Sequence, residues 1–198
     1  MAKSPVAGRV KQRLGREIGT VAAIGFYRTC LSHTLRRVEA DPRWRSYVAV
    51  SPDGDMRSAV WKLLAPRRTI RLAQGGGNLG QRMQRLFCAV PPGPAIIVGS
   101  DIPAISAREI ANAFRLLGKA DAVFGPASDG GYWLIGLKRS PRLLAPFTGV
   151  RWSSDQALAD TLANLKGRKA AFVATLDDVD GAGAYRRCRR DWGVLSRR

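Results

Sequence analysis

The sequence lacks any apolar run long enough to cross a membrane, which would need about 18 consecutive apolar residues. The first five residues, Met1-Ala2-Lys3-Ser4-Pro5, also lack the apolar stretch of a signal peptide. These two absences predict a cytoplasmic protein with no transmembrane segment.

Cysteine and histidine are scarce. The three cysteines, Cys30, Cys88 and Cys188, lie far apart and show none of the close spacings of zinc sites. His33 is the single histidine, so no second imidazole can help it to bind a metal. We therefore expect reduced thiols and a histidine on the surface of a helix.

Acidic residues are outnumbered, with 15 Asp and Glu against 33 Lys and Arg and a formal net charge of +18. Such a charge attracts anions, and nucleic acid, an anionic membrane surface and phosphorylated small molecules all satisfy it. No zinc-finger spacing and no stacking-aromatic signature accompanies the charge. We therefore expect no specific nucleic-acid partner and at most weak contact with anionic membranes.

The length of 198 residues, 45% of them hydrophobic, fits one domain over residues 1–198. Strand-like and helix-like segments alternate from residue 20 onward, which predicts an α/β fold: a Rossmann-like three-layer sandwich with a mostly parallel sheet. The helix from Thr20 is expected to bury one face. Its buried face is expected to consist of Val21, Ile24, Leu31, Leu35 and Val38. The strands are expected at 47–50, 69–72, 95–98, 123–124, 132–137 and 169–176.

The segment from Gly125 to Gly136 interrupts a strand-like apolar run with Asp129-Gly130-Gly131. A carboxylate beside glycines can meet a metal, a sugar hydroxyl or a ribose, because glycine lets the backbone approach closely. Asp-Gly is equally typical of a hairpin turn. Both interpretations stay open from the local sequence.

Other acidic residues also lie near predicted strand boundaries. Asp101 follows one strand, and Asp178 and Asp180 follow the last one. In open α/β sheets, ligands bind beyond the carboxyl ends of the strands. Together these carboxylates favour a divalent cation with oxygen ligands, Mg²⁺ or Mn²⁺, shared with substrate phosphates.

Basic residues near the amino end supply the opposite charge. Gly8 allows a tight loop, and Lys11 and Arg13 could hold a diphosphate, although the spacing of a P-loop is absent. A basic, disordered amino end is the alternative. Further along, Asn78 and Gln81 are spaced as a helix N-terminal cap pair after a glycine-rich loop.

Several segments match those of one bacterial family over nearly the whole chain. The most specific segment, G-P-A-x-D-G-G-Y-x-L-I-G-L, is intact from Gly125 to Leu137. The family's K-x-P-x-x-G-x-x-K-T-R-L, G-D-L-G-E-R-M, G-x-D-x-P, W-S-T and D-x-D segments correspond to residues 3–14, 77–83, 99–103, 152–154 and 178–180. Acid-to-amide changes occur at Asn78 and Gln81, and Gln12 replaces the threonine of the first segment. The chain thus resembles the nucleotide-diphospho-sugar transferases often labelled arsenosugar-biosynthesis glycosyltransferases.

The resemblance implies a glycosyltransferase A-type fold that transfers a sugar from a nucleotide-diphosphate donor to a small-molecule acceptor, with a divalent metal. By this resemblance, Asp101 is the metal ligand and Asp129 is the first candidate for the catalytic base, with Asp178 or Asp180 the second. The nucleotide and its phosphates would be bound by Gly8, Lys11, Arg13, Asn78, Gly80 and Arg82. The sugar or acceptor would be bound by Gly130, Gly131, Tyr132 and Trp152.

Members of this family carry an apolar strand immediately before the first lysine, whereas only Met1 and Ala2 precede Lys3 here. We therefore expect the first strand to be missing and the first residues to be poorly anchored. Two other functions remain open: a guanylyltransferase-like nucleotidyltransferase acting on a small phosphorylated substrate, and a non-catalytic basic protein that binds nucleic acid or membrane.

Overall fold

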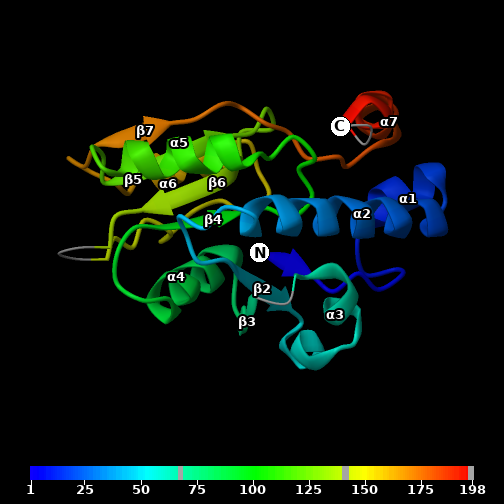
Figure 1. Cartoon of the computed structure of the whole chain (residues 1–198). Helices are drawn as coiled ribbons and strands as arrows, with labels where there is room; N and C mark the ends of the chain where they lie inside the picture. The colour runs from blue at the N-terminus through cyan, green and yellow to red at the C-terminus, as the bar shows by residue number, and fades with distance from the viewer. Residues whose placement is uncertain (67–68, 140–142, 196–198) are drawn as a thin grey trace.

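The chain folds as a mixed α/β protein (Figure 1). The computed structural model describes residues 1–66, 69–139 and 143–195, with side chains as far as residue 190. The strands are β1 (Ala2–Lys3), β2 (Tyr47–Ser51), β3 (Ile70–Ala73), β4 (Ala95–Val98), β5 (Ala122–Pro126), β6 (Tyr132–Leu137) and β7 (Ala170–Phe172). The helices are α1 (Gln12–Ile18), α2 (Thr20–Glu39), the 3-10 helix η1 (Asp53–Arg57), α3 (Val60–Leu64), α4 (Leu79–Ala89), α5 (Ala107–Leu117), α6 (Ala157–Ala163) and α7 (Ala182–Leu195). Among the described residues, no helix has the length and apolarity that a membrane span requires.

The strands form two hydrogen-bonded groups, β1-β2-β3 and β4-β6-β5-β7. The amine of Met1 joins them, since it donates a hydrogen bond to the carbonyl oxygen of Val98 at 2.7 Å. The amino end consequently lies between β2 and β4 (Figure 1). Pairing is parallel for β1-β2, β2-β3 and β5-β7 and antiparallel for β4-β6 and β5-β6. The sheet is therefore mostly parallel, as predicted.

The expectation of a poorly anchored amino end is wrong, and the first strand is present but only two residues long. Ala2 and Lys3 form the short strand β1, in register with Val50 and Ser51. The N–H of Ser4 continues this pairing with a 2.8 Å hydrogen bond to the carbonyl oxygen of Ser51, and both Ala2 and Ser4 are buried. This short strand is anchored by its pairing with β2 and, through the adjacent Met1 amine, by the hydrogen bond to the Val98 carbonyl.

Helix α2 lies across the sheet with a buried face close to the predicted one. Leu31 is buried, and Ile24 and Leu35 pack beside it. Val21, however, is 85% exposed. The helical repeat carries the buried stripe through Ala23 instead, so the first turn turns Val21 toward solvent.

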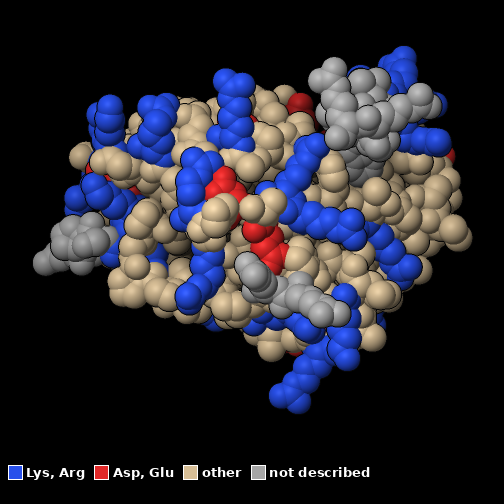
Figure 2. Space-filling view, viewed as in Figure 1, with Lys and Arg blue, Asp and Glu red and all other residues tan. Residues whose placement is uncertain are grey.

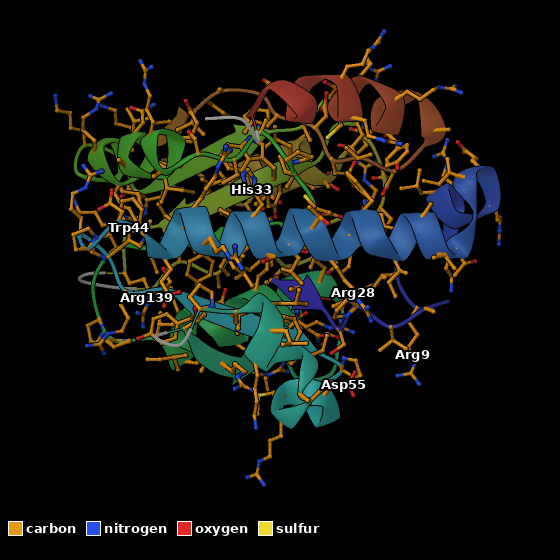
Figure 3. The ribbon with its side chains drawn as sticks, turned by 45° about the vertical axis from the view of Figure 1, so that its right-hand side comes forward. Arg9, Arg28, His33, Trp44, Asp55 and Arg139 are labelled. Carbon is orange, nitrogen blue, oxygen red and sulfur yellow. The ribbon has the colours of Figure 1, made fainter. Side chains whose placement is uncertain are left out.

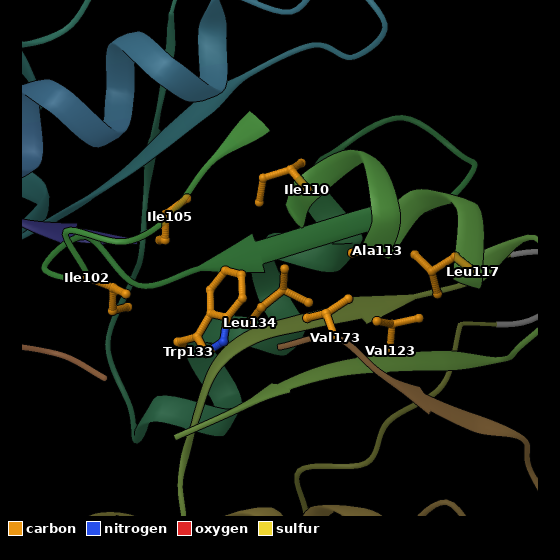
Figure 4. Packing of buried hydrophobic residues seen from close by; sticks show 9 residues of the cluster. All are labelled: Ile102, Ile105, Ile110, Ala113, Leu117, Val123, Trp133, Leu134 and Val173. Atoms are coloured by element: carbon orange, nitrogen blue, oxygen red, sulfur yellow. The ribbon is translucent and has the colours of Figure 1, made fainter. Parts of the chain in front are cut away.

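Apolar clusters cover both faces of the second group of strands, in addition to the cluster that packs α2 on β1 and β2. Successive residues of a strand point to opposite faces, and Leu134 accordingly packs with Ile110 of α5 (Figure 4), whereas Ile135 packs with Phe87 of α4. Trp133 lies where the β5–β6 register shifts, so the alternation is interrupted there and Trp133 also joins the α5 side; its indole N–H donates to the carbonyl oxygen of Ala174 at 2.9 Å. This bond holds the chain after β7 against β6, which positions the acidic residues that follow.

Candidate functional site

A cleft of about 530 Å³ opens where the carboxyl ends of β1 and β4 meet β6. Its lining comes from segments far apart in the chain: the basic amino-terminal segment, the first turns of α4, the loop after β4, strand β6 and the chain after β7. Figure 2 shows a small group of acidic side chains near the middle of one face, bordered by basic ones. The residues used below are Lys11, Arg82, Asp101, Tyr132, Asp178 and Asp180.

The acidic trio of the cleft consists of Asp101, Asp178 and Asp180. One carboxylate oxygen from each lies within 4.8 Å of the others. Asp101 is placed by the turn after β4, where the N–H of Gly99 donates to the carbonyl oxygen of Trp133 at 2.9 Å. The other two carboxylates are brought in by the chain after β7, which stays beside β5 through a 3.1 Å hydrogen bond from the Leu176 N–H to Pro126.

Lys11 places its ammonium among these carboxylates. Nζ lies 2.7 Å from Oδ2 of Asp101, 2.5 Å from Oδ1 of Asp180 and 3.5 Å from Oδ2 of Asp178. Only 4% of its side chain is exposed. Burial lowers the pKa of this ammonium, but attraction to Asp101 and Asp180 is stronger, and the net result is a pKa raised above its usual value. Lys11 is therefore a charged, buried cation.

The carboxyl of Asp178 has a perturbed pKa. Burial raises it, the like charges of Asp180 and Asp101 raise it further, and Lys11 opposes them, leaving the pKa at about 6. Excess negative charge thus remains at the trio even with Lys11 present.

The composition of the trio fits a divalent cation. Carboxylate oxygens are the ligands of Mg²⁺ and Mn²⁺, and the ammonium of Lys11 is a stand-in cation at the same point. Asp101, Asp178 and Asp180 are the residues that could hold such an ion.

Tyr27 and Ser100 are site residues that the sequence analysis missed. The Tyr27 hydroxyl donates to the carbonyl oxygen of Lys3 at 3.0 Å, accepts from the Lys3 N–H at 3.1 Å, and lies 3.2 Å from Oγ of Ser100. Burial raises the pKa of Tyr27 to about 12. The available signal was its position on the buried stripe of α2, where a tyrosine needs a partner for its hydroxyl.

The predicted phosphate-binding residues divide into two groups. Lys11, Arg13 and Arg82 line the cleft, whereas Gly8, Asn78 and Gly80 do not. Gly8 has a φ of 75° in the turn before Lys11. Arg9, beside it, also lines the cleft, and Figure 3 shows it on the amino-terminal loop.

The glycine-rich loop is held by its own helix. The predicted cap of α4 is confirmed. The Asn78 side chain accepts a hydrogen bond from the Gln81 N–H at 2.9 Å, and the Gln81 side chain accepts one from the Asn78 N–H at 2.9 Å. Gly80 is tightly packed here: a Cβ on it would lie 2.7 Å from both Phe147 and Trp152.

The Asp129-Gly130-Gly131 segment forms the predicted hairpin turn between β5 and β6. Oδ1 of Asp129 accepts from the Gly131 N–H at 2.9 Å, and the carbonyl oxygen of Gly130 accepts from the Leu158 N–H at 3.0 Å. These three residues and Trp152 lie outside the cleft lining, whereas Tyr132 at the start of β6 is inside it.

His33 lies on α2, as predicted (Figure 3), and it is half-buried. Burial first, and then the positive charges of Arg37 and Arg36, lower the pKa of its imidazole. It is separate from the cleft lining.

A bacterial family described as an uncharacterized protein conserved in bacteria, DUF2064, matches residues 34–154, more than half of the chain. The chain belongs to the DUF2064 family. No curated protein matches it significantly. The description of DUF2064 names no activity, so the arsenosugar assignment suggested by the sequence stays a prediction.

Solved structures similar to this DUF2064 chain share its fold. One is a protein from Desulfovibrio desulfuricans G20, provisionally assigned as a nucleotide-diphospho-sugar transferase, with 28% identity over 91% of this chain and 80% of that one and a TM-score of 0.83. A 4-diphosphocytidyl-2C-methyl-D-erythritol synthase from Anaerococcus prevotii DSM 20548 has 10% identity over 83% and 86% of the chains, with a TM-score of 0.60. The Rv0371c protein of Mycobacterium tuberculosis H37Rv, in complex with manganese, has 16% identity over 92% of each chain and a TM-score of 0.53. The fold is therefore that of nucleotide-sugar transferase-like enzymes.

Proposed function

We propose that this protein is a glycosyltransferase that moves a sugar from a nucleotide-diphosphate donor to a small-molecule acceptor with the help of Mg²⁺ or Mn²⁺. The observation that carries the proposal is the meeting of basic and acidic side chains in one cleft: Lys11 lies within 2.7 Å of Asp101, and Arg13 and Arg82 line the same cleft. The similarity to the Desulfovibrio protein supports the choice of a nucleotide sugar as donor. A cytoplasmic location is part of the proposal.

Transfer requires that the negative charge developing on the leaving nucleoside diphosphate be stabilised. Lys11, Arg13 and Arg82 would bind the phosphates, with Arg82 oriented by a 2.9 Å hydrogen bond from its Nε to the carbonyl oxygen of Gly77. That bond also joins Arg82 to the glycine-rich loop at residues 75–77. Gly8, Asn78 and Gly80 would act by shaping the two loops and the helix that carry these cations. A metal held by Asp101 with Asp178 and Asp180 would supply Lewis-acid stabilisation of the diphosphate.

Activation of the acceptor requires a carboxylate that takes the proton of its hydroxyl. The family segment makes Asp129 the first candidate for this base, and Asp178 or Asp180 the second. The cleft geometry favours the second, because both of these aspartates line the cleft. The one of the two that accepts the proton would not at the same time be a ligand of the metal. Tyr132 would contact the sugar or acceptor from β6, and Gly130, Gly131 and Trp152 would support that side from behind the lining.

The test is a binding and turnover panel of nucleotide sugars with and without Mn²⁺, followed by thermal shift and by product analysis. A ligand at a hundredfold excess over its Kd stabilises the fold by about 2.7 kcal/mol, which thermal shift detects readily. We expect one donor to bind with Mn²⁺ and to release a nucleoside diphosphate. Asp101→Asn should abolish this effect. The matched control is Asp121→Asn, because Asp121 immediately precedes β5 and lies outside the cleft lining.

Other outcomes assign other functions. Release of pyrophosphate from a nucleoside triphosphate would assign nucleotidyl transfer to the protein in place of glycosyl transfer. Steep salt-dependent binding to DNA or to anionic vesicles that Asp101→Asn leaves unchanged would indicate a basic binding protein. Absence of binding for every nucleotide sugar would overturn the proposal.

A further inference from the structure

The ammonium of Lys11 occupies the point at which a cation would be bound by the acidic trio. It lies 2.7 Å from Asp101 and 2.5 Å from Asp180, and 3.5 Å from Asp178. Oxygen ligands of Mg²⁺ lie about 2.0–2.1 Å from the ion, so a metal at this point leaves no room for an ammonium among the same oxygens. The two cations exclude each other by space and by like charge.

The backbone of Lys11 indicates that this placement is built into the fold. Lys11 has φ 48° and ψ 42°, the left-handed conformation, which is uncommon for a residue with a side chain. Residues held in sparsely populated conformations persist only where the surroundings fix them, and they cluster at functional sites. Here the N–H of Gly15 donates to the carbonyl oxygen of Lys11 at 2.8 Å, at the start of α1, and the three carboxylates hold the other end of the side chain.

Among the described residues, the salt bridges to the trio all come from Lys11. The side chain of Arg13 is 80% exposed and lies beside Glu17, and Arg82 bonds to the loop carbonyl of Gly77. Lys11 is thus the cation in contact with the trio within the described chain. Its flexible four-carbon stem allows the ammonium to turn to a different anion when one is offered.

We propose that the ammonium of Lys11 competes with the metal for the carboxylates of the acidic trio. It occupies them until the diphosphate of a donor binds and attracts the ammonium away. Metal and donor then bind cooperatively: the diphosphate takes Lys11, the released carboxylates take the metal, and each ligand tightens the other by the same factor. This inference rests on the proposed function, since it assigns the trio to a metal. It explains why one site contains both a charged lysine and three carboxylates.

The test is a Mn²⁺ titration without nucleotide, with free Mn²⁺ measured by electron paramagnetic resonance, on the full chain and on three variants. Lys11→Met keeps the length of the side chain and removes its charge, Lys11→Arg keeps the charge, and Lys62→Met removes an exposed lysine of α3 as control. We expect Lys11→Met to bind Mn²⁺ at least tenfold more tightly than the unaltered chain, a change of about 1.4 kcal/mol. Lys11→Arg and Lys62→Met should bind as the unaltered chain does.

Thermal unfolding distinguishes a change in Mn²⁺ affinity from a folding defect. Without a cation, Lys11→Met leaves three close carboxylates unpaired, so its Tm should fall, and Mn²⁺ should raise that Tm more than it raises the Tm of the unaltered chain. The double variant Lys11→Met with Asp101→Asn should lose the gain in affinity, which locates the gain at the trio.

Equal or weaker Mn²⁺ binding by Lys11→Met would overturn the inference, and so would a gain that survives Asp101→Asn. These results are distinguishable from failure of the proposed function. If no nucleotide sugar binds, the proposed glycosyl transfer is rejected, but the Mn²⁺ titration still tests the role of Lys11. If the Mn²⁺ affinities are equal, the role of Lys11 is rejected, but donor binding can still be observed.

Discussion

The carboxylate of Asp177 accepts two hydrogen bonds from Ser128. The Ser128 N–H donates to Oδ1 at 2.8 Å and the hydroxyl donates to Oδ2 at 3.0 Å. Asp177 immediately precedes the acidic pair of the cleft, and Ser128 immediately precedes the Asp129 turn. This contact therefore joins the segment that the sequence singled out to the acidic trio that the structure places in the cleft.

Replacing Asp177 with alanine should loosen both segments. The exposed carboxylate makes two hydrogen bonds, and we expect the free energy of unfolding to fall by about 1 kcal/mol. Because the Asp178 and Asp180 carboxylates would lose their support, Mn²⁺ affinity should fall as well. Urea unfolding and Mn²⁺ titration measure the two effects.

Asp121→Ala is the matched control for Asp177. Asp121 also bonds across to the chain of β7, since its Oδ2 accepts from the Lys169 N–H at 3.0 Å, but it precedes β5 and so lies at the other end of the strand. It should show a similar loss of stability with unchanged Mn²⁺ affinity. A loss of Mn²⁺ affinity in both variants would assign the effect to general destabilisation.

Gly80 offers a test of packing against ligand binding. Gly80→Ala would place a Cβ 2.7 Å from Phe147 and Trp152, and such overpacking costs about 1–3 kcal/mol of unfolding free energy. Gly25→Ala in α2 meets nothing within 4 Å, so it should stabilise the chain by up to about 1 kcal/mol through helix propensity. Stability is measured by urea unfolding. A Gly80→Ala variant with unchanged stability and lost nucleotide affinity would instead support the phosphate-binding role predicted from the sequence.

Strands, caps and acidic strand ends could be predicted from the sequence because they depend on local chemistry. Apolar β-branched runs marked β2 and β4, and Asn78 and Gln81 marked the start of α4. The contact of Lys11 with Asp101 could not be predicted, because it joins segments that only the folded sheet brings together. The packing role of Gly80 was equally hidden, since it depends on the path of the loop that carries Phe147 and Trp152.

The Arg151–Asp160 ion pair predicts a pH dependence of stability. Hydrogen bonds from Arg151 lower the pKa of Asp160 to about 2 from its usual 3.8. A carboxyl with a lowered pKa in the folded state contributes stability above about pH 4, and this contribution is lost as the pH falls toward 2. The Tm difference between the unaltered chain and Arg151→Gln should therefore be largest at neutral pH and shrink between pH 4 and pH 2. Arg108→Gln, on the exposed part of α5, controls for the loss of one positive charge; an identical pH profile for both variants would contradict the assignment.

An apolar cavity of about 630 Å³ lies between β2 and β4 beside Met1. In the described chain, β1 covers β2 only at Val50 and Ser51, which leaves Tyr47 to Ala49 without a strand partner on that side. On the facing side, β4 pairs with β6 and receives only the Met1 amine, at Val98. Two strand edges thus face each other across an apolar space, a geometry that accepts an added strand.

Four apolar residues joined in front of Met1 should extend β1 into this cavity. An extended tetrapeptide spans about 13 Å, and each buried Val or Ile side chain gains about 1.5–3 kcal/mol over its exposed state, before the cost of ordering it. We expect a net stabilisation of about 2 kcal/mol, which raises Tm by about 4–8 °C in a chain of this length. An extension of four polar residues is the control, and equal Tm values for both would contradict the prediction.

The same extension should change the pH dependence of stability. Burial lowers the pKa of the Met1 amine from 8.0 to about 6, with the charge of Asp101 opposing the shift. Between pH 6 and pH 8 the unfolded chain therefore binds more protons than the folded one, and the contribution of this amine makes stability rise with pH across that window. An amide in place of the amine still donates its N–H to the Val98 carbonyl but carries no titrating proton. The rise between pH 6 and pH 8 should thus be smaller in the extended chain, and thermal unfolding at both pH values measures it; an unchanged slope would show that the amine is solvated in the folded protein.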